Sequence, residues 1–138
     1  MSMLSVPLKC NQCEQTAHGT GCMIQERPGV CGKDPDMESL QETLLYGLKG
    51  MCAYAHHARR LGKTDEGVNA FVEEALFSTM TNVNFDVPAL LELVLECGRQ
   101  NLRVMEMLDE GHKEKFGDPS IATVLEGTSA GPGILVSG

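Results

Sequence analysis

Four of the six cysteines lie close together near the start of the chain, with the spacing C-x2-C-x8-C-x8-C. These four are Cys10, Cys13, Cys22 and Cys31, and the other two, Cys52 and Cys97, stand alone. Disulfide frameworks belong mainly to small secreted domains, whereas this chain has a helical remainder that can bury a core of its own. A C-x2-C pair lets two thiolates from one turn face one centre, so the pattern predicts a metal or iron–sulfur site.

Zinc and an iron–sulfur cluster are the two kinds of centre considered for these cysteines. A zinc ribbon usually has two C-x2-C pairs, whereas only the first pair is close here. A cubane cluster favours thiolates along an irregular loop, and glycines beside Cys22 and Cys31 let the backbone approach sulfur closely. Residues 1–33 carry three basic and two acidic residues, and residues 34–138 carry eight and seventeen. An anionic thiolate-bound centre would thus lie in the segment that is not acidic. Taken together, the spacing and the charge favour iron–sulfur over zinc.

Most of the remaining chain has apolar residues three and four positions apart, the periodicity of helices. The pattern predicts a first helix that has Asp36 as its cap and ends near Gly62. A second helix is expected to begin near residues 64–65 and to stop in a turn at 82–84. A third helix is expected to have Asp86 as its cap.

Each predicted helix carries one apolar stripe, which we expect to face the core of a three-helix bundle. The stripes are Leu40, Leu44, Leu45, Leu48, Met51, Cys52 and Ala55 in the first helix, Val68, Phe71, Val72, Ala75, Leu76 and Met80 in the second, and Leu91, Val94, Leu95, Gly98, Leu102, Met105 and Leu108 in the third. The linkers are short enough for antiparallel neighbours.

Residues 117–138 are rich in glycine and serine and end in the short apolar run ILVSG at 134–138. Such a run is typical of a buried strand, yet no other convincing strand exists in the sequence to pair with it. An unpaired strand has two exposed edges, so we expect 134–138 to begin an α/β domain supplied by further sequence. The predicted fold is all-α, with a cysteine-rich iron–sulfur loop at 1–35, a three-helix bundle at 36–116, and a linker leading to that strand.

The composition argues against two classes of partner. The formal net charge is −8 and aromatic residues make up 4% of the chain. This disfavours a phosphate-binding surface and stacking on single-stranded nucleic acid.

No unbroken apolar run approaches the roughly 18 residues that a membrane span needs. Residues 1–9 lack the basic start and apolar stretch of a secretory signal, so a cytoplasmic, reducing location is expected.

Four stretches spread over almost the whole chain match one known family. They are KCNQCEQTAHGTGC, GVCGKDPDMESLQETLLYGLKGMCAYAHHARRLG, FSTMTNVNFD and GPGILVSG. Together they resemble the N-terminal part of the hybrid cluster proteins, or prismane proteins, also called hydroxylamine reductases. The spacing before Cys31 is longer than the family's usual one, around residues 24–28. The chain has room for only one helix bundle, and in this it resembles the shorter form of the family.

The resemblance implies a [4Fe-4S] cluster on Cys10, Cys13, Cys22 and Cys31 that receives electrons from an electron-donor protein. It also implies a hybrid iron–sulfur–oxygen cluster, expected only in α/β domains beyond this chain. There a small nitrogen-oxide substrate would react, with hydroxylamine reduced to ammonia or nitric oxide detoxified. We therefore expect the electron-entry part of a hydroxylamine reductase-type oxidoreductase, with no catalytic residue of its own. The alternative is a zinc-stapled helical interaction module without redox activity.

The remaining candidate ligands have simpler explanations. Cys52 and Cys97 lie on or near apolar stripes, where a buried cysteine usually packs as a small hydrophobe. His18 is expected to be an exposed loop side chain. His56 and His57 are adjacent on a helix and so point about 100° apart, which is unsuitable for joint chelation.

Overall fold

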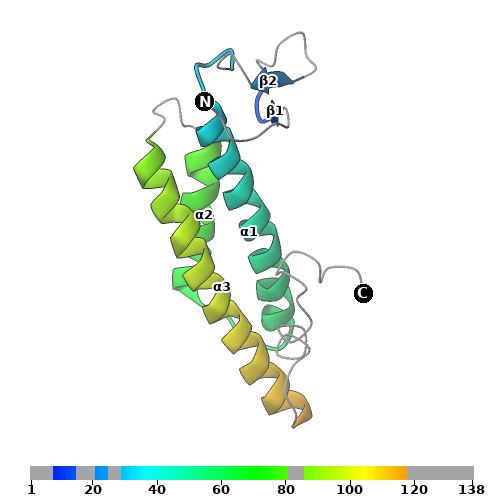
Figure 1. Cartoon of the computed structure of the whole chain (residues 1–138). Coiled ribbons are helices and arrows are strands. Elements are labelled where there is room, and N and C mark those ends of the chain that lie inside the picture. The colour runs from blue at the N-terminus through cyan, green and yellow to red at the C-terminus, as the bar shows by residue number, and fades with distance from the viewer. Residues whose placement is uncertain (1–7, 15–20, 25–28, 81–85, 118–138) are drawn as a thin grey trace.

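The computed structural model describes residues 8–14, 21–24, 29–80 and 86–117. The elements in chain order are β1 (Leu8–Cys10), β2 (Cys22–Ile24), α1 (Pro35–Arg60), α2 (Glu66–Met80) and α3 (Val87–Phe116). The three helices run alongside one another, and the strand pair lies at the end where α1 begins (Figure 1). The predicted all-α class and three-helix bundle are confirmed.

Some sequence-based predictions fall outside the described residues. They are the turn at 82–84, the exposure of His18, and the linker and strand at 118–138. In the part of the chain that is described, no helix is long and apolar enough to cross a membrane.

Helix α1 begins earlier than its predicted cap. The carboxylate of Asp34 accepts a hydrogen bond from the backbone N–H of Met37 at 2.8 Å, so Asp34 is the N-cap. The prediction of Asp36 was wrong, because Asp36 lies in the first turn, where its charge favours the helix dipole. Pro35 fits the first helical position, where no backbone donor is needed. The predicted end is confirmed, since α1 stops at Arg60 just before a left-handed glycine.

The cap of α3 is the predicted one. The Asp86 side chain accepts a hydrogen bond from the backbone N–H of Ala89 at 3.0 Å. At the other end, Gly117 takes the left-handed conformation with φ +79° and closes the helix after Phe116.

The core lies mainly between α1 and α3, which share the most extensive contact in the bundle. Its buried side chains are Met37, Leu44, Leu48, Met51, Tyr54 and Ala58 from α1, Val68, Phe71 and Ala75 from α2, and Leu90, Cys97, Val104, Met107 and Leu108 from α3. Helix α2 contacts the other two much less. Two of its predicted core residues, Leu76 and Met80, are accordingly exposed.

The predicted core stripe of α3 was partly wrong. Leu91, Leu95 and Leu102 are 45%, 50% and 57% exposed. Leu90 and Val104, which the predicted stripe left out, are buried in the core. Apolar residues cover more than one face of α3, so periodicity alone does not select the face that packs on α1.

The two isolated cysteines have different surroundings. Cys97 is buried between α1 and α3, as predicted. Its Sγ would lie only 3.0 Å from a Cβ placed on Gly47 of α1, so the glycine permits this close approach. The prediction for Cys52 was wrong: its side chain is exposed and lines an open groove between α1 and α2 with His56 and Glu73. The reason is that α2 packs loosely on this side of α1.

The antiparallel pair of β1 and β2 was not predicted from the sequence. Its register places Leu8 opposite Ile24, Lys9 opposite Met23, and Cys10 opposite Cys22. Each strand has three residues, which is too short for a recognisable alternation of apolar and polar side chains. The pairing brings two of the four clustered cysteines to facing positions.

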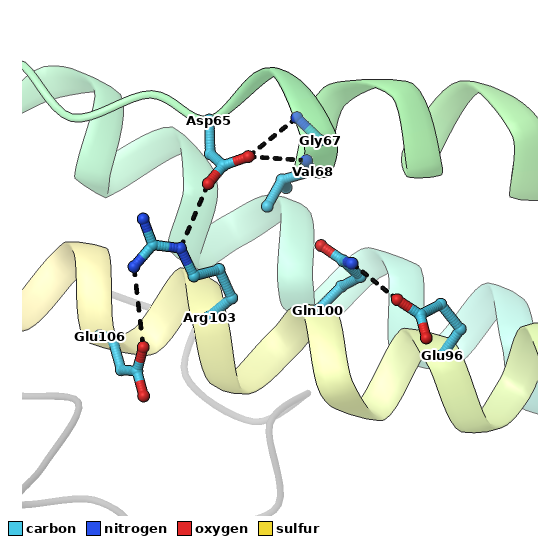
Figure 2. A network of polar contacts seen from close by, with 7 residues as sticks. All are labelled: Asp65, Gly67, Val68, Glu96, Gln100, Arg103 and Glu106. Carbon is cyan, nitrogen blue, oxygen red and sulfur yellow. Dashed lines mark hydrogen bonds and ion pairs between the residues drawn. The ribbon is translucent and has the colours of Figure 1, made fainter.

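A polar network joins the start of α2 to the middle of α3 (Figure 2). One carboxylate oxygen of Asp65 accepts hydrogen bonds from the backbone N–H groups of Gly67 at 2.8 Å and Val68 at 3.2 Å. The other oxygen accepts a hydrogen bond from Arg103 Nε at 3.2 Å, and Arg103 also lies near Glu106. Asp65 therefore both caps α2 and connects it to α3.

Replacing Asp65 with alanine should lower the free energy of unfolding by about 1 kcal/mol at neutral pH, because an N-cap is lost. The Val68 N–H and then the Arg103 side chain lower the pKa of Asp65 below its ordinary value. A carboxylate with a lowered folded-state pKa stabilises the fold above its unfolded-state pKa, and this contribution is lost as pH falls through the folded-state pKa. Urea unfolding at several pH values should therefore show the two proteins converging in acid.

The control for this experiment is Asp65→Asn, which can still cap the helix but carries no charge toward Arg103. The asparagine variant should retain most of the parent's free energy of unfolding at neutral pH. Because asparagine does not titrate, the difference in stability between the asparagine and alanine variants should stay the same in acid. An unchanged difference between the alanine variant and the parent from pH 7 to about pH 2 would contradict the assignment, since Asp65 would then not be titrating in its capping role.

Candidate metal centre

The clustered cysteines occupy two kinds of position in the structure. Cys10 is buried at the end of β1 and faces the partly buried Cys22 of β2. Cys13 and Cys31 are exposed, in the turns that follow β1 and precede α1. None of the six cysteines, all of which are described, forms a disulfide.

The structure brings Cys10 and Cys22 together but does not gather all four cysteines. No group of three or more His, Cys, Asp or Glu side chains that could hold a metal ion occurs among the described residues. The two loops that separate Cys13, Cys22 and Cys31 include residues 15–20 and 25–28, which lie outside the description.

A buried lysine lies against the first of these cysteines. Lys33 is 4% exposed, and its Nζ donates a hydrogen bond to Cys10 Sγ at 3.1 Å. The same ammonium donates to Gln12 Oε1 at 2.9 Å and to Glu38 Oε2 at 2.7 Å. Since Glu38 belongs to the start of α1, Lys33 connects the cysteine-rich segment to the helix bundle.

The backbone between Cys31 and α1 positions this lysine. The N–H of Gly29 donates to the Lys33 carbonyl at 2.8 Å, and the N–H of Gly32 donates to the Gly29 carbonyl at 2.8 Å. Gly32 has φ +89°, a conformation that few other residues adopt without strain. Asp34 then caps α1, so the tight turn and the helix start together direct the lysine side chain inward.

Burial and charge act in opposite directions at this site. Burial disfavours a charged Lys33, but the hydrogen bonds and charges of Glu38 and Cys10 outweigh it, so the pKa of Lys33 lies above its ordinary value. Burial raises the pKa of the Cys10 thiol above its ordinary value, and a backbone hydrogen bond from Gln12 and the Lys33 ammonium offset this only in part. A cationic lysine is therefore present where a cysteine would have to lose its proton to bind metal.

These residues fit a thiolate-bound metal centre in their chemistry. Soft thiolates are the ligands of iron–sulfur clusters and of zinc, and both kinds of centre carry negative charge when four thiolates bind. Lys33 supplies a buried positive charge and a donor to sulfur at one of those thiolates. At Gly21, φ is +97° and a Cβ would come within 3.1 Å of the Cys10 carbonyl oxygen, so this close approach requires glycine.

The Lys33–Glu38 pair was missed from the sequence, where Lys33 entered only as part of a charge balance. Its position two residues after Cys31 was the available hint. Glu38 has no distinguishing pattern, because acidic residues are common in the first turn of any helix. The contact between Lys33 and Cys10 spans 23 positions in the chain, a distance over which sequence periodicity carries no information.

The fold and the candidate centre define a class of protein, a helix bundle preceded by a cysteine-rich segment with the ligand chemistry of a metal site. Comparison with known families gives the assignment within that class. The model of the Prismane/CO dehydrogenase family matches residues 8–94, which include all four clustered cysteines. The chain belongs to this family, as its resemblance to the hybrid cluster proteins indicated.

Several curated relatives are similar to nearly all of this chain. A hydroxylamine reductase of Moorella thermoacetica is 57% identical over 129 residues, which are 94% of this chain and 30% of that protein. Hydroxylamine reductases of Thermotoga maritima and Methanothermobacter thermautotrophicus are 48% and 46% identical, each over 94% of this chain. The chain thus spans about 30% of the length of these relatives.

Proposed function

We propose that this chain is the electron-entry part of a hydroxylamine reductase-type oxidoreductase and holds a [4Fe-4S] cluster on Cys10, Cys13, Cys22 and Cys31. The observation that carries the proposal is its similarity, over 94% of its residues, to proteins named hydroxylamine reductase. A cluster of this type supplies one-electron redox chemistry when bound. The chain's own residues provide its thiolates, a counter-charge and a connection to the helix bundle.

The arrangement around Cys10 supports a cluster in this segment. The Lys33 ammonium stabilises a thiolate at Cys10, and the strand pairing holds Cys22 opposite. Among the described residues of the range 8–33, few large apolar side chains are buried, and Ile24 is the largest of them. Metal–thiolate bonds would therefore provide much of the order of this segment.

The proposal extends to the rest of the enzyme. α/β domains beyond this chain would hold the hybrid cluster and bind the nitrogen-oxide substrate, either hydroxylamine or nitric oxide. An electron-donor protein in the cytoplasm would reduce the cluster of this chain. The aligned segment is 30% of the Moorella protein but 22% of the Rhodospirillum rubrum protein, so the relatives of higher identity include shorter chains. This supports the shorter family form with one helix bundle.

The test is anaerobic reconstitution of the chain with iron and sulfide. We expect the broad visible absorption of thiolate-bound iron, bleached by dithionite, and about four iron atoms per chain. A colourless protein that binds one zinc ion and no iron under these conditions would overturn the proposal and favour the zinc-stapled module.

Metal binding and order of the cysteine-rich segment should be coupled. Without metal, limited proteolysis should cut between Lys9 and Lys33 and leave α1 to α3 intact, because the helices bury their own core. After reconstitution the same cuts should slow at least tenfold. Mass spectrometry of the fragments measures both outcomes. Equal protection of the segment with and without metal would contradict the coupling.

A further inference from the structure

A buried ion pair lies between the candidate metal centre and the helix bundle. Lys33 Nζ and Glu38 Oε2 are 2.7 Å apart, with side chains 5% and 1% exposed. Removing two charges from water is unfavourable, and the attraction between them often fails to offset that cost. The other lysine–glutamate pair among the described residues, Lys63–Glu114, lies at the surface, where no such cost arises. The buried pair therefore calls for a role beyond stability.

Each of the three N–H donors of the Lys33 ammonium has a hydrogen-bond acceptor, so the position of the charge is fixed. An ammonium group has three N–H donors, and the three acceptors around Lys33 are Cys10 Sγ, Gln12 Oε1 and Glu38 Oε2. Two of these acceptors belong to the cysteine-rich segment and one belongs to α1. The positive charge is consequently held at one place, 3.1 Å from a sulfur atom that would bind the cluster.

Glu38 supplies the opposing charge at the same place. Its second carboxylate oxygen, Oε1, is buried and has no hydrogen-bond partner among the described residues. Lys33 is the cation paired with this carboxylate. Removing either partner would therefore change the net charge beside Cys10 by one unit, and the two removals would change it in opposite directions.

We propose that Lys33 and Glu38 are positioning residues that tune the reduction potential of a metal centre bound through Cys10, Lys33 raising the potential and Glu38 lowering it. This inference rests on the proposed function. One electron taken from dithionite makes the centre one unit more negative. A fixed ammonium that donates to a ligand sulfur stabilises that reduced form, and a nearby carboxylate destabilises it.

The experiment compares Lys33→Met and Glu38→Gln in the 138-residue chain, reconstituted with iron and sulfide. The midpoint potential is measured by redox titration followed by electron paramagnetic resonance, and iron per chain is measured in parallel. We expect the potential to fall in Lys33→Met and to rise in Glu38→Gln. The control, Lys63→Met, breaks the exposed pair and should leave the potential unchanged.

The opposite signs separate tuning from a purely structural role, which would reduce the iron content of both variants or shift both potentials the same way. Potentials equal to that of the parent, or shifted in the same direction, would overturn this inference while the cluster itself stood. A parent chain that forms no cluster would overturn the proposed function and this inference with it. If Lys33→Met retains no iron, the Glu38→Gln variant alone tests the inference. Any result for that variant other than a midpoint potential above that of the parent then overturns the inference.

Discussion

Cys13→Ser should remove most of the iron from the reconstituted chain. A serine oxygen is a hard ligand that replaces a soft thiolate at one corner of the proposed cluster. Cys13 is exposed in the turn after β1, so the substitution removes no core packing that could account for the loss. Iron and sulfide per chain, measured after anaerobic reconstitution and desalting, should fall at least several-fold relative to the parent.

The matched control is Cys52→Ser, the same chemical change at another exposed cysteine. Cys52 lies on α1 beside the groove between α1 and α2, away from the strand pair. Its substitution should therefore leave the iron content unchanged. Equal loss of iron in both variants would mean that the ligand set is wrongly assigned. Retention of iron in both would show that Cys13 is not a ligand.

The number of helices and most of their ends could be predicted from the sequence because they depend on local interactions. The cap at Asp86 and the stop before Gly62 each follow from residues within one turn of the helix end. The error at the start of α1 was also local. Asp34 and Asp36 are equally good caps by type, and Pro35, which favours the first helical position, decides between them.

The packing of the helices could not be predicted in the same way. Which face of α3 is buried depends on how α1 approaches it, and that approach depends on Gly47 allowing Cys97 to come close. The four candidate cysteine ligands could be predicted from the sequence because their spacing is a local pattern. The Lys33–Glu38 pair could not be predicted, since it arises from the way the turn at Gly32 directs the Lys33 side chain toward Cys10 at the end of β1.

The buried face of α3 in the structure differs from the predicted one, and this difference can be tested with one variant and one control in the same helix. Leu90→Ala should lower the free energy of unfolding by about 2–5 kcal/mol, because Leu90 is 2% exposed and belongs to the buried core. That is a large part of the roughly 5–15 kcal/mol that stabilises a typical domain. Leu102→Ala should change it by no more than about 0.5 kcal/mol, because Leu102 is 57% exposed.

Chemical unfolding of the metal-free chain, followed by circular dichroism of the helices, measures both values without interference from the cysteine-rich segment. Periodicity alone places Leu102 in the core, whereas the structure places Leu90 there, so the two substitutions discriminate between the two faces. A larger loss for Leu102→Ala than for Leu90→Ala would mean that α3 is rotated about its axis relative to this structure. The positions of Cys97 and Gly47 would then have to change as well, since both depend on the same contact between α1 and α3.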